Sequence, residues 1–249
     1  VNKLIDFNGF EIDNSEHKKR LTYNHQEIEY IVDKVDTKRN NGIVKYTSFE
    51  VYKDMLLFLC GTGMRFGDMV RLRIDDYEFR DGNRTEGSFS FIMEKTSRKV
   101  VIPIEGYVHQ IWKKYSRGKK YRQGYFVFPR TKFGNPISNQ KFNQHIKEIC
   151  EIVGLKRWVR KPKYNLQGKV IIGSDEQVPL YDLVSSHIGR RTFIREHIEI
   201  GTPPRKIMKM TGHSSQDVFD GYYEILNKDV HGINRKIYQI TTTEELKVN

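Results

Sequence analysis

The sequence predicts a mainly α-helical domain with a small antiparallel β-sheet of about three strands, an α+β arrangement. Three observations lead to this prediction. Apolar residues recur at helical spacing along most of the chain, a strand-like pattern is confined to residues 89–104, and glycine and proline interrupt the helical pattern in the last third. The 249 residues, 37% of them hydrophobic, are enough for one large domain with a sizeable core.

The first part of the chain is predicted to contain three helices. Residues 23–36 have apolar side chains on one helical face, and residues 46–60 form a second, more apolar helix. Gly61-Thr62-Gly63 ends this second helix, because glycine accepts the left-handed conformation in which helices commonly stop. A third helix follows from about Phe66 to Leu72.

A β-hairpin is predicted where the period of the apolar residues changes. Phe89–Met93 and Val100–Ile104 have the composition of strands, and the polar Thr96–Lys99 between them is typical of a hairpin turn. The helical pattern returns from Glu105 to Tyr115.

The rest of the chain is again mostly helical in pattern. Residues 138–153 have an apolar face, whereas residues 155–184 are basic, irregular and interrupted by glycine and proline, so we expect a β-hairpin insertion there. Residues 186–226 predict three short helices, which are separated at Gly201–Pro204 and at Thr211-Gly212.

Charge and cysteine content narrow the function classes. The chain has 43 Lys and Arg against 31 Asp and Glu, a net charge of +12, so we expect a polyanionic partner, nucleic acid first and a membrane surface second. No apolar run reaches the ~18 residues that span a bilayer, and the N-terminus has no signal-peptide pattern. Cys60 and Cys150 form neither a metal-binding pattern nor a disulfide framework, which favours a reduced, cytoplasmic setting.

Arg65 follows a glycine turn at a predicted helix start, in Gly61-Thr62-Gly63-Met64-Arg65-Phe66-Gly67-Asp68. Backbone N–H groups at a helix start, with a guanidinium beside them, can bind a phosphate. An ordinary surface arginine at a helix boundary would have the same pattern. Asp68, one turn after Arg65, could orient that arginine or a neighbour, or could be only an acidic residue on the helix surface.

Two further patterns lie in the last third. His187 and Arg190 are three residues apart, so on a helix they share a face and can donate hydrogen bonds to two oxygens of one phosphate. His213 follows Gly212 at a helix break, and Tyr222 comes nine residues later. Each pattern also fits an ordinary solvated or capped helix.

Lys95 lies in Glu94-Lys95-Thr96, at the end of the first predicted strand. A lysine at a hairpin tip can enter a DNA groove or protonate a leaving oxygen. A solvated turn lysine without function is the common alternative.

The order of Arg65, Lys95, His187-x-x-Arg190, Gly212-His213 and Tyr222 resembles the tyrosine recombinase (phage-type integrase) family. The resemblance covers about residues 22–226 and is closest in Thr62–Arg65, Ser186–Phe193, Met210–His213 and the hairpin from Lys95 to Pro103. It is strongest to integrases of mobile elements. It implies the catalytic-domain fold of that family and a site-specific DNA recombinase that acts on double-stranded DNA.

The resemblance also implies the reaction. A tyrosine oxygen attacks a DNA phosphodiester, a 3′-phosphotyrosine forms and a 5′-hydroxyl leaves, and the 5′-hydroxyl of a second strand reverses the step. The bond energy is retained in the phosphotyrosine, so no ATP, metal or other cofactor is needed. The sequence has no Walker-type phosphate loop and no clustered carboxylates typical of a two-metal nuclease.

The resemblance assigns a role to each residue. Arg65 and Arg190 stabilise the charge that develops on the phosphate oxygens, and His213 donates a further hydrogen bond to them. His187 is the candidate general base for the nucleophile Tyr222, and Lys95 is the candidate general acid for the 5′-oxygen. The spacing of nine residues from His213 selects Tyr222 over Tyr223, and neighbours on a helix point about 100° apart, so both cannot face the phosphate equally.

Further basic residues are candidates for contacts to the DNA backbone, which position a duplex without reading its sequence. The alternative is that these residues only lie in solvated loops. The candidates form two runs and one position beside Arg190: Lys113, Lys114, Arg117, Lys119, Lys120, Arg122, Lys156, Arg157, Arg160, Lys161, Lys163 and Arg191.

The domain expectations follow the family pattern. We expect residues 1–21 to be an arm or linker from a missing N-terminal DNA-binding domain, residues 22–226 to be the catalytic domain, and residues 227–249 to be a tail that could link neighbouring subunits. The resemblance implies a homo-tetramer on DNA and a monomer when free, in the cytoplasm or on the bacterial nucleoid. Type IB topoisomerase-like strand relaxation and a non-catalytic DNA-binding module are the alternatives.

Overall fold

The computed structural model describes a set of residues that divide into two units. Residues 20–214 form one unit, and helix α9 (Gln216–Tyr223) belongs to the other. The described residues are 27, 31, 47–80, 83–116, 124–155, 157–161, 163, 165, 167 and 176–223. None of the helices among them is long and apolar enough to cross a lipid bilayer.

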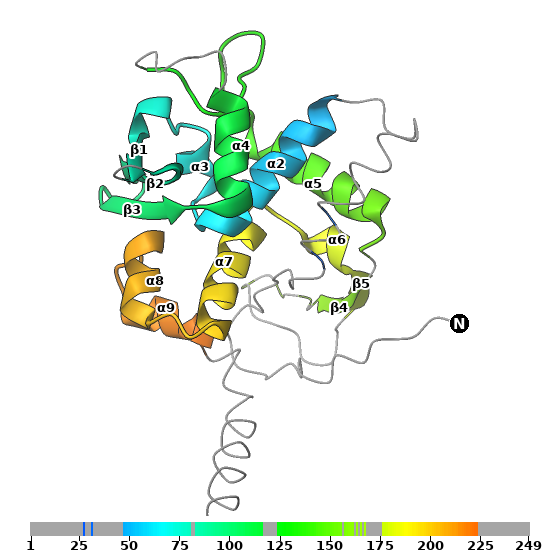
Figure 1. Ribbon diagram of the computed structural model, residues 1–249. Coiled ribbons are helices and arrows are strands. Elements are labelled where there is room, and N and C mark those ends of the chain that lie inside the picture. Colours follow the sequence, from blue (N-terminus) through cyan, green and yellow to red (C-terminus); the bar gives the residue numbers. More distant parts are fainter. Residues whose placement is uncertain are drawn as a thin grey trace, which may run out of the picture. The chain divides into compact units, whose positions relative to one another are not determined.

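The larger unit consists of helices with two small sheets (Figure 1). Its helices are α2 (Thr47–Thr62), α3 (Phe66–Met69), the 3-10 helix η1 (Ile74–Asp76), α4 (Gly106–Ser116), α5 (Asn139–Val153), α6 (Leu180–Leu183), α7 (His187–Glu199) and α8 (Pro204–Thr211). Its strands are β1 (Tyr77–Arg80), β2 (Asn83–Ile92), β3 (Lys99–Ile104), β4 (Trp158–Lys161) and β5 (Glu176–Pro179).

Helix α2 is the central element of the larger unit. All residues from Tyr52 to Cys60 are buried, because α4, α5, α7 and strand β3 pack around this helix. A helix that is apolar on nearly all sides requires such a position. Gly189 allows α7 to approach α2 closely, since a Cβ at this position would lie 2.6 Å from the Cβ of Leu59.

The three-stranded sheet β1-β2-β3 is antiparallel, as expected. In β3, exposed and buried residues alternate, and Ile102 pairs with Phe89 of β2 on the core side. Strand β1 and the first half of β2 were not predicted. In β1, the aromatic Tyr77 and Phe79 alternate with charged residues, but the run is only four residues long, and the first half of β2 is polar without a strand pattern.

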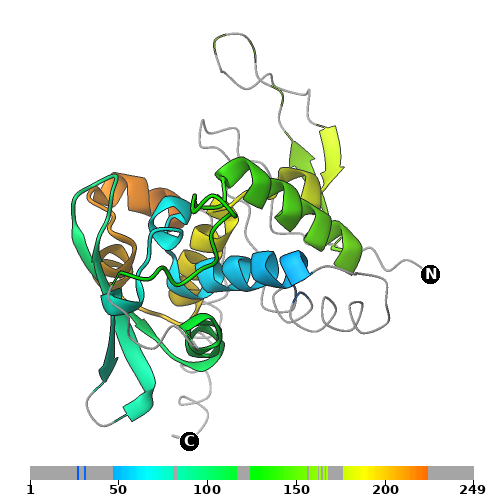
Figure 2. The ribbon, with the colours of Figure 1, turned by 90° about the horizontal axis from the view of Figure 1, so that it is seen from above.

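A second antiparallel pair, β4-β5, confirms the expected β-hairpin insertion, with Val159 opposite Val178. It lies on the side of α2 opposite to the three-stranded sheet (Figures 1 and 2). The short helix α6 follows directly after β5 and was not predicted.

Most predicted helices are present, with shifts at their ends. Helix α5 begins after Ser138, whose side chain accepts a hydrogen bond from Lys141 N at 3.2 Å, and is capped at its C-terminus by Gly154 with φ of 85°. Helix α3 ends at Met69, so the predicted helix to Leu72 was too long. Of the predicted helix 23–36, Glu27 and Ile31 are described, and both are helical and buried. The expected arm 1–21 and tail 227–249 lie outside the described residues.

Candidate active site

Arg190 joins two helix ends inside the larger unit. Its side chain is 1% exposed, and its Nη1 donates to Gly63 O at 2.9 Å while Nη2 donates to Thr211 O. Gly63 directly follows α2, and Thr211 is the last residue of α8. The carbonyl ends of helices carry partial negative charge, so both ends favour a guanidinium. Arg190 thereby brings two of the predicted motifs into contact.

Two glycines allow this close packing. Gly63 has φ of 64°, and a Cβ there would lie 2.5 Å from the ring of Phe193 on α7. Gly212 has φ of 66°, and a Cβ there would overlap the sulfur of Met93. Only glycine combines this backbone conformation with such a short approach.

His213 contacts Arg190 and Thr211. The Nη2 atom of Arg190 lies 3.2 Å from Nε2 of the imidazole, and Nδ1 lies 2.7 Å from Thr211 Oγ1. The Thr211 hydroxyl also donates to Ile207 O at 2.6 Å. The predicted Gly-His motif therefore meets Arg190 of the His-x-x-Arg motif directly.

Arg65 is half-buried and precedes α3, and its Nη1 contacts Met93 Sδ at 3.7 Å. Met93 is 2% exposed and lies against Gly212 as well. This methionine therefore connects the Arg65 motif with the Gly-His motif. Its only signal in the sequence was its place next to Glu94-Lys95 at the end of a predicted strand.

Asp68 is buried, so the alternative of a simple helix-surface acid is wrong. Its Oδ1 accepts a hydrogen bond from Glu94 N at 3.0 Å. Burial raises the pKa of Asp68, and the positive charges of Arg65, Arg71 and Arg190 oppose that rise. Both predicted arginines therefore lie within electrostatic range of one carboxylate.

Lys95 is exposed on the turn between β2 and β3. The base of this turn is held in place, because Arg98 O accepts from Met93 N at 2.9 Å and Asp68 accepts from Glu94 N. Arg98 Nη1 donates to His213 O at 3.4 Å. The lysine thus extends from a turn that is attached both to α3 and to the Gly-His motif.

The other two predicted catalytic residues are placed differently. His187 is the first residue of α7 and is exposed, whereas Arg190 three residues later is buried. Tyr222 belongs to α9 in the other unit, and its side chain lies outside the described residues. The structure brings together Arg65, Arg190 and His213, with Asp68 beside them.

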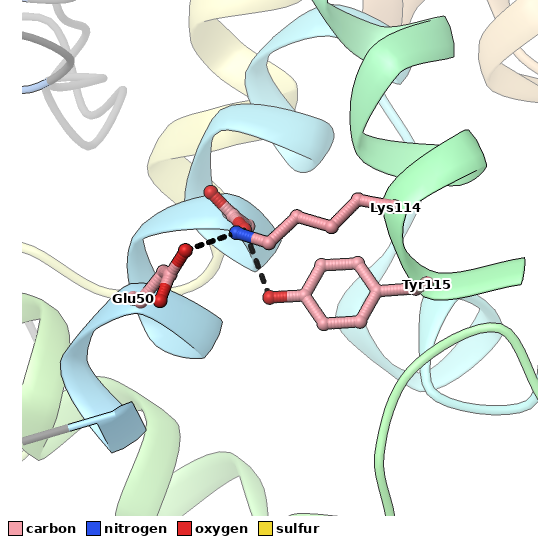
Figure 3. A network of polar contacts seen from close by, with 4 residues as sticks. Glu50, Lys114 and Tyr115 are labelled. Atoms are coloured by element: carbon pink, nitrogen blue, oxygen red, sulfur yellow. Dashed lines mark hydrogen bonds and ion pairs between the residues drawn. The ribbon is translucent and has the colours of Figure 1, made fainter. Parts of the chain in front are cut away.

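Lys114, a predicted DNA contact, belongs to a network of polar contacts between α4 and α2 (Figure 3). Its Nζ donates to Glu50 Oε1 at 2.5 Å and to Asp54 Oδ2 at 2.6 Å, and Tyr115 donates to the same Asp54 oxygen at 2.8 Å. Burial acts to lower the pKa of Lys114, but the hydrogen bonds and charges of Asp54 and Glu50 outweigh it and raise the pKa. The carboxylates thus neutralise this lysine and join α4 to α2.

Arg157 is also paired with a carboxylate. Its Nε donates to Glu27 Oε1 at 2.8 Å and its Nη2 to Glu27 Oε2 at 3.3 Å. The remaining basic candidates vary in exposure. Arg191 is half-buried, and Lys113, Lys161 and Lys163 are exposed. Arg117, Lys119, Lys120, Arg122, Lys156 and the side chain of Arg160 lie outside the described residues.

No three His, Cys, Asp or Glu side chains among the described residues are grouped so that they could hold a metal ion. Cys60 and Cys150 are free and buried, and burial raises the pKa of the Cys60 thiol.

The fold is similar to that of several solved structures. The XerH site-specific recombinase bound to difH substrate gives a TM-score of 0.57 at 14% identity, with 82% of this chain and 51% of that chain covered. The XerA recombinase gives 0.54 at 14% identity over 85% and 64% of the two chains. A lambda integrase dimer bound to a COC′ core site gives 0.52 at 15% identity over 83% and 49%. The chain thus spans about half to two thirds of the length of these structures.

The sequence comparisons differ in outcome. No curated protein matches the chain. The model of the phage integrase family matches residues 22–228, which is most of the 249 residues. The solved structures above share the expected fold, mainly α-helical with a small antiparallel sheet. The chain belongs to the phage integrase family, the tyrosine recombinases.

Proposed function

We propose that the protein is a site-specific DNA recombinase, or integrase, that cleaves and rejoins DNA strands through a 3′-phosphotyrosine intermediate without ATP or a metal ion. One observation supports this proposal most strongly. Arg65, Arg190 and His213 come from three separate sequence motifs, and contacts through Gly63, Met93 and Thr211 gather them in one place.

The gathered cations suit the chemistry of a phosphodiester. When a nucleophile attacks phosphorus, the non-bridging oxygens gain negative charge, which guanidinium groups stabilise through charge-assisted hydrogen bonds. The contacts of Arg190 with Gly63 and Thr211 are to neutral carbonyls, which leave its positive charge in place. Because Arg190 is 1% exposed, a phosphate must displace one of its present contacts to bind it directly.

The remaining roles complete the proposed reaction. Tyr222 is the nucleophile, His187 the general base and Lys95 the general acid that protonates the leaving 5′-oxygen. Lys95 suits this role because its turn is attached to α3 and to His213 while its side chain is exposed. The proposal requires helix α9 to present Tyr222 to the phosphate that Arg190 and His213 bind.

The proposed partner is double-stranded DNA, on which the protein acts as a homo-tetramer, with a monomer as the free form. Residues 1–21 are proposed as a linker, residues 22–226 as the catalytic domain and residues 227–249 as the segment that links neighbouring subunits. The proposed location is the cytoplasm, on the nucleoid when DNA is bound. Exposed lysines such as Lys113, Lys161 and Lys163 remain candidates for backbone contacts, whereas Lys114 and Arg157 are already paired with carboxylates.

A nicked suicide DNA substrate tests the proposal. Such a substrate loses a short fragment after cleavage, so the covalent protein–DNA adduct accumulates. We expect an adduct with the wild-type protein and with Tyr223→Phe, no adduct with Tyr222→Phe, and no effect of excess chelator. Tyr223→Phe is the matched control, because it removes the neighbouring hydroxyl from the same helix.

The alternatives predict other outcomes. A non-catalytic DNA-binding module forms no adduct at all, which would refute the proposal. An adduct with Tyr222→Phe would refute the assignment of the nucleophile. A topoisomerase would relax supercoiled DNA but would not transfer a cleaved strand to a second duplex.

A further inference from the structure

We infer that Thr211 is a positioning residue, which fixes the tautomer of His213 with a proton on Nδ1 and so orients the ring for the substrate phosphate. The inference rests on the proposed function, because His213 is the histidine that we propose binds the phosphate oxygens. Thr211 is the last residue of α8 and is 1% exposed, so its hydroxyl cannot exchange its partners freely with water.

The number of available protons determines the direction of each hydrogen bond. A threonine hydroxyl has one proton to donate. Thr211 Oγ1 lies 2.6 Å from Ile207 O and 2.7 Å from His213 Nδ1. The carbonyl of Ile207 carries no proton, so the hydroxyl donates to it and accepts from His213. The imidazole therefore carries a proton on Nδ1.

The opposite tautomer fits these distances poorly. If Nδ1 were unprotonated, the hydroxyl proton would go to the imidazole. Thr211 Oγ1 and Ile207 O would then face each other at 2.6 Å without a proton between them, which is unfavourable for two partly negative oxygens.

Arg190 does not select the tautomer, although it contacts the same ring. Its Nη2 lies 3.2 Å from Nε2 and 3.4 Å from Nδ1, so the guanidinium is nearly equidistant from the two ring nitrogens. Arg98 Nη1 donates to the backbone oxygen of His213 at 3.4 Å, which does not involve a ring nitrogen. Among these neighbours, the Thr211 hydroxyl is the one that distinguishes Nδ1 from Nε2.

A consequence for the proposed reaction follows. Both the neutral Nδ1–H form and the imidazolium carry a proton on Nδ1, so Thr211 can keep its contact in either state. Nε2 is then the ring nitrogen proposed to meet the phosphate, in place of its present contact with Arg190 Nη2 at 3.2 Å. It donates to a phosphate oxygen only after it has gained a proton itself.

The first test observes the tautomer. Long-range ¹H–¹⁵N correlation spectra of the imidazoles show which nitrogen carries the proton, and His213→Gln identifies the signals of His213. We expect the Nδ1–H form in the wild-type protein and in Thr211→Ser, and a loss of that preference in Thr211→Val. A wild-type protein with its proton on Nε2 overturns the inference, and this outcome does not depend on the folding of any variant.

Thr62→Val is the matched control for these spectra. Thr62 is 0% exposed and its hydroxyl makes the same kind of bond to the fourth preceding residue, with Phe58 O at 2.7 Å. Its other contact is Met64 N rather than an imidazole. The signals of His213 should therefore be unchanged in this variant, and a change as large as that in Thr211→Val would overturn the inference.

The second test measures cleavage under single-turnover conditions. Loss of one oriented hydrogen bond in Thr211→Val should slow cleavage about tenfold while DNA affinity changes less than about twofold, and Thr211→Ser should restore the rate. Equal cleavage rates in all three proteins would overturn the inference. A wild-type protein that forms no adduct would refute the proposed function instead, and the tautomer spectra would still decide the role of Thr211.

Discussion

Arg190 and Lys114 are both cations that the sequence marked for phosphate contact, but the structure gives them opposite kinds of partner. Arg190 donates to the carbonyls of Gly63 and Thr211 at two helix ends. Lys114 donates to the carboxylates of Glu50 and Asp54. Carbonyls orient a cation without cancelling its charge, whereas two carboxylates more than neutralise it.

The comparison shows why charge along the sequence is a poor guide to anion binding. Arg157 repeats the pattern of Lys114, because Glu27 binds it through both carboxylate oxygens. A cation that is paired in this way stabilises the fold but has little remaining attraction for a phosphate. We therefore expect fewer DNA contacts than the number of basic residues in a run.

The largest expected effect is that of Arg190→Lys. A lysine keeps the charge but cannot reach both carbonyls, so cleavage should fall on the order of 10²-fold or more. A buried carbonyl without a partner costs about 1–3 kcal/mol, so the melting temperature should fall as well. Suicide-substrate cleavage and thermal unfolding measure the two effects.

Arg195→Lys on the same helix is the control for Arg190→Lys. Arg195 pairs with Glu199 four residues away, at 2.6 Å, and such pairs near the surface contribute little to stability. Cleavage and melting temperature should both stay close to wild type. Wild-type cleavage by Arg190→Lys would contradict the role that we propose for Arg190.

A smaller effect separates two neighbouring lysines. Lys113 and Lys114 lie in the last turn of α4, but only Lys114 has a described carboxylate partner. Lys113→Met should reduce the slope of log K against log salt by about 0.9, the value for one lost phosphate contact. Lys114→Met should leave the slope unchanged and reduce the free energy of unfolding by about 1 kcal/mol.

Salt titrations of DNA binding and chemical denaturation of both variants measure this difference. If Lys114→Met reduces the salt slope as much as Lys113→Met, then pairing with Glu50 and Asp54 does not prevent Lys114 from contacting DNA. The comparison with Arg190 would then fail.

The smallest expected effect concerns His109, a titratable group for which the described part of the chain shows no carboxylate partner. It is 5% exposed, it stacks with Trp112, and its Nε2 has no hydrogen-bond partner among the described residues. Burial lowers the pKa of His109, and the charge of Lys113 lowers it further. The unfolded chain therefore binds a proton more readily than the folded one below about pH 6.5.

The free energy of unfolding should consequently decline as pH falls below about 6.5, and His109 should contribute nothing to a pH dependence well above that value. Thermal unfolding between about pH 8 and about pH 5 measures the decline. His109→Phe keeps an aromatic ring and should reduce the decline. An equally steep decline in this variant would show that other groups cause it.

Much of the fold could be predicted because local patterns agree with it. The apolar helix that became α2, the capped helix α5 and the breaks around α8 were all visible as periodicity and glycine or proline positions. Strand β1 was not predicted, because the alternation of aromatic and charged residues in Tyr77–Arg80 spans only four residues, and its pairing partner β2 begins with polar residues. The end of α3 was misplaced, because the apolar pattern continues to Leu72 after the helix has stopped.

The residues of the candidate site likewise include some that the sequence predicted and some that it did not. Arg65, Arg190 and His213 were identified through the family resemblance of their motifs, and the structure places them together. Met93 was not identified, because a methionine carries no signal of contact with an arginine 28 residues away. Thr211 was noted only as part of a helix break and a motif, because its contact with the His213 side chain depends on the geometry at the end of α8. The base of the Lys95 turn is likewise fixed by Asp68, which is distant in sequence.

The sequence by itself determined the class of fold, the positive charge and the candidate residues for phosphate chemistry, since these depend on local spacing, composition and recognisable motifs. The tertiary structure decided which cations donate hydrogen bonds to carbonyls and which pair with carboxylates. That outcome depends on whether packing places a carbonyl, as for Arg190, or a carboxylate, as for Lys114, within hydrogen-bond distance. Such partners come from other elements of the fold, and local sequence patterns do not encode them.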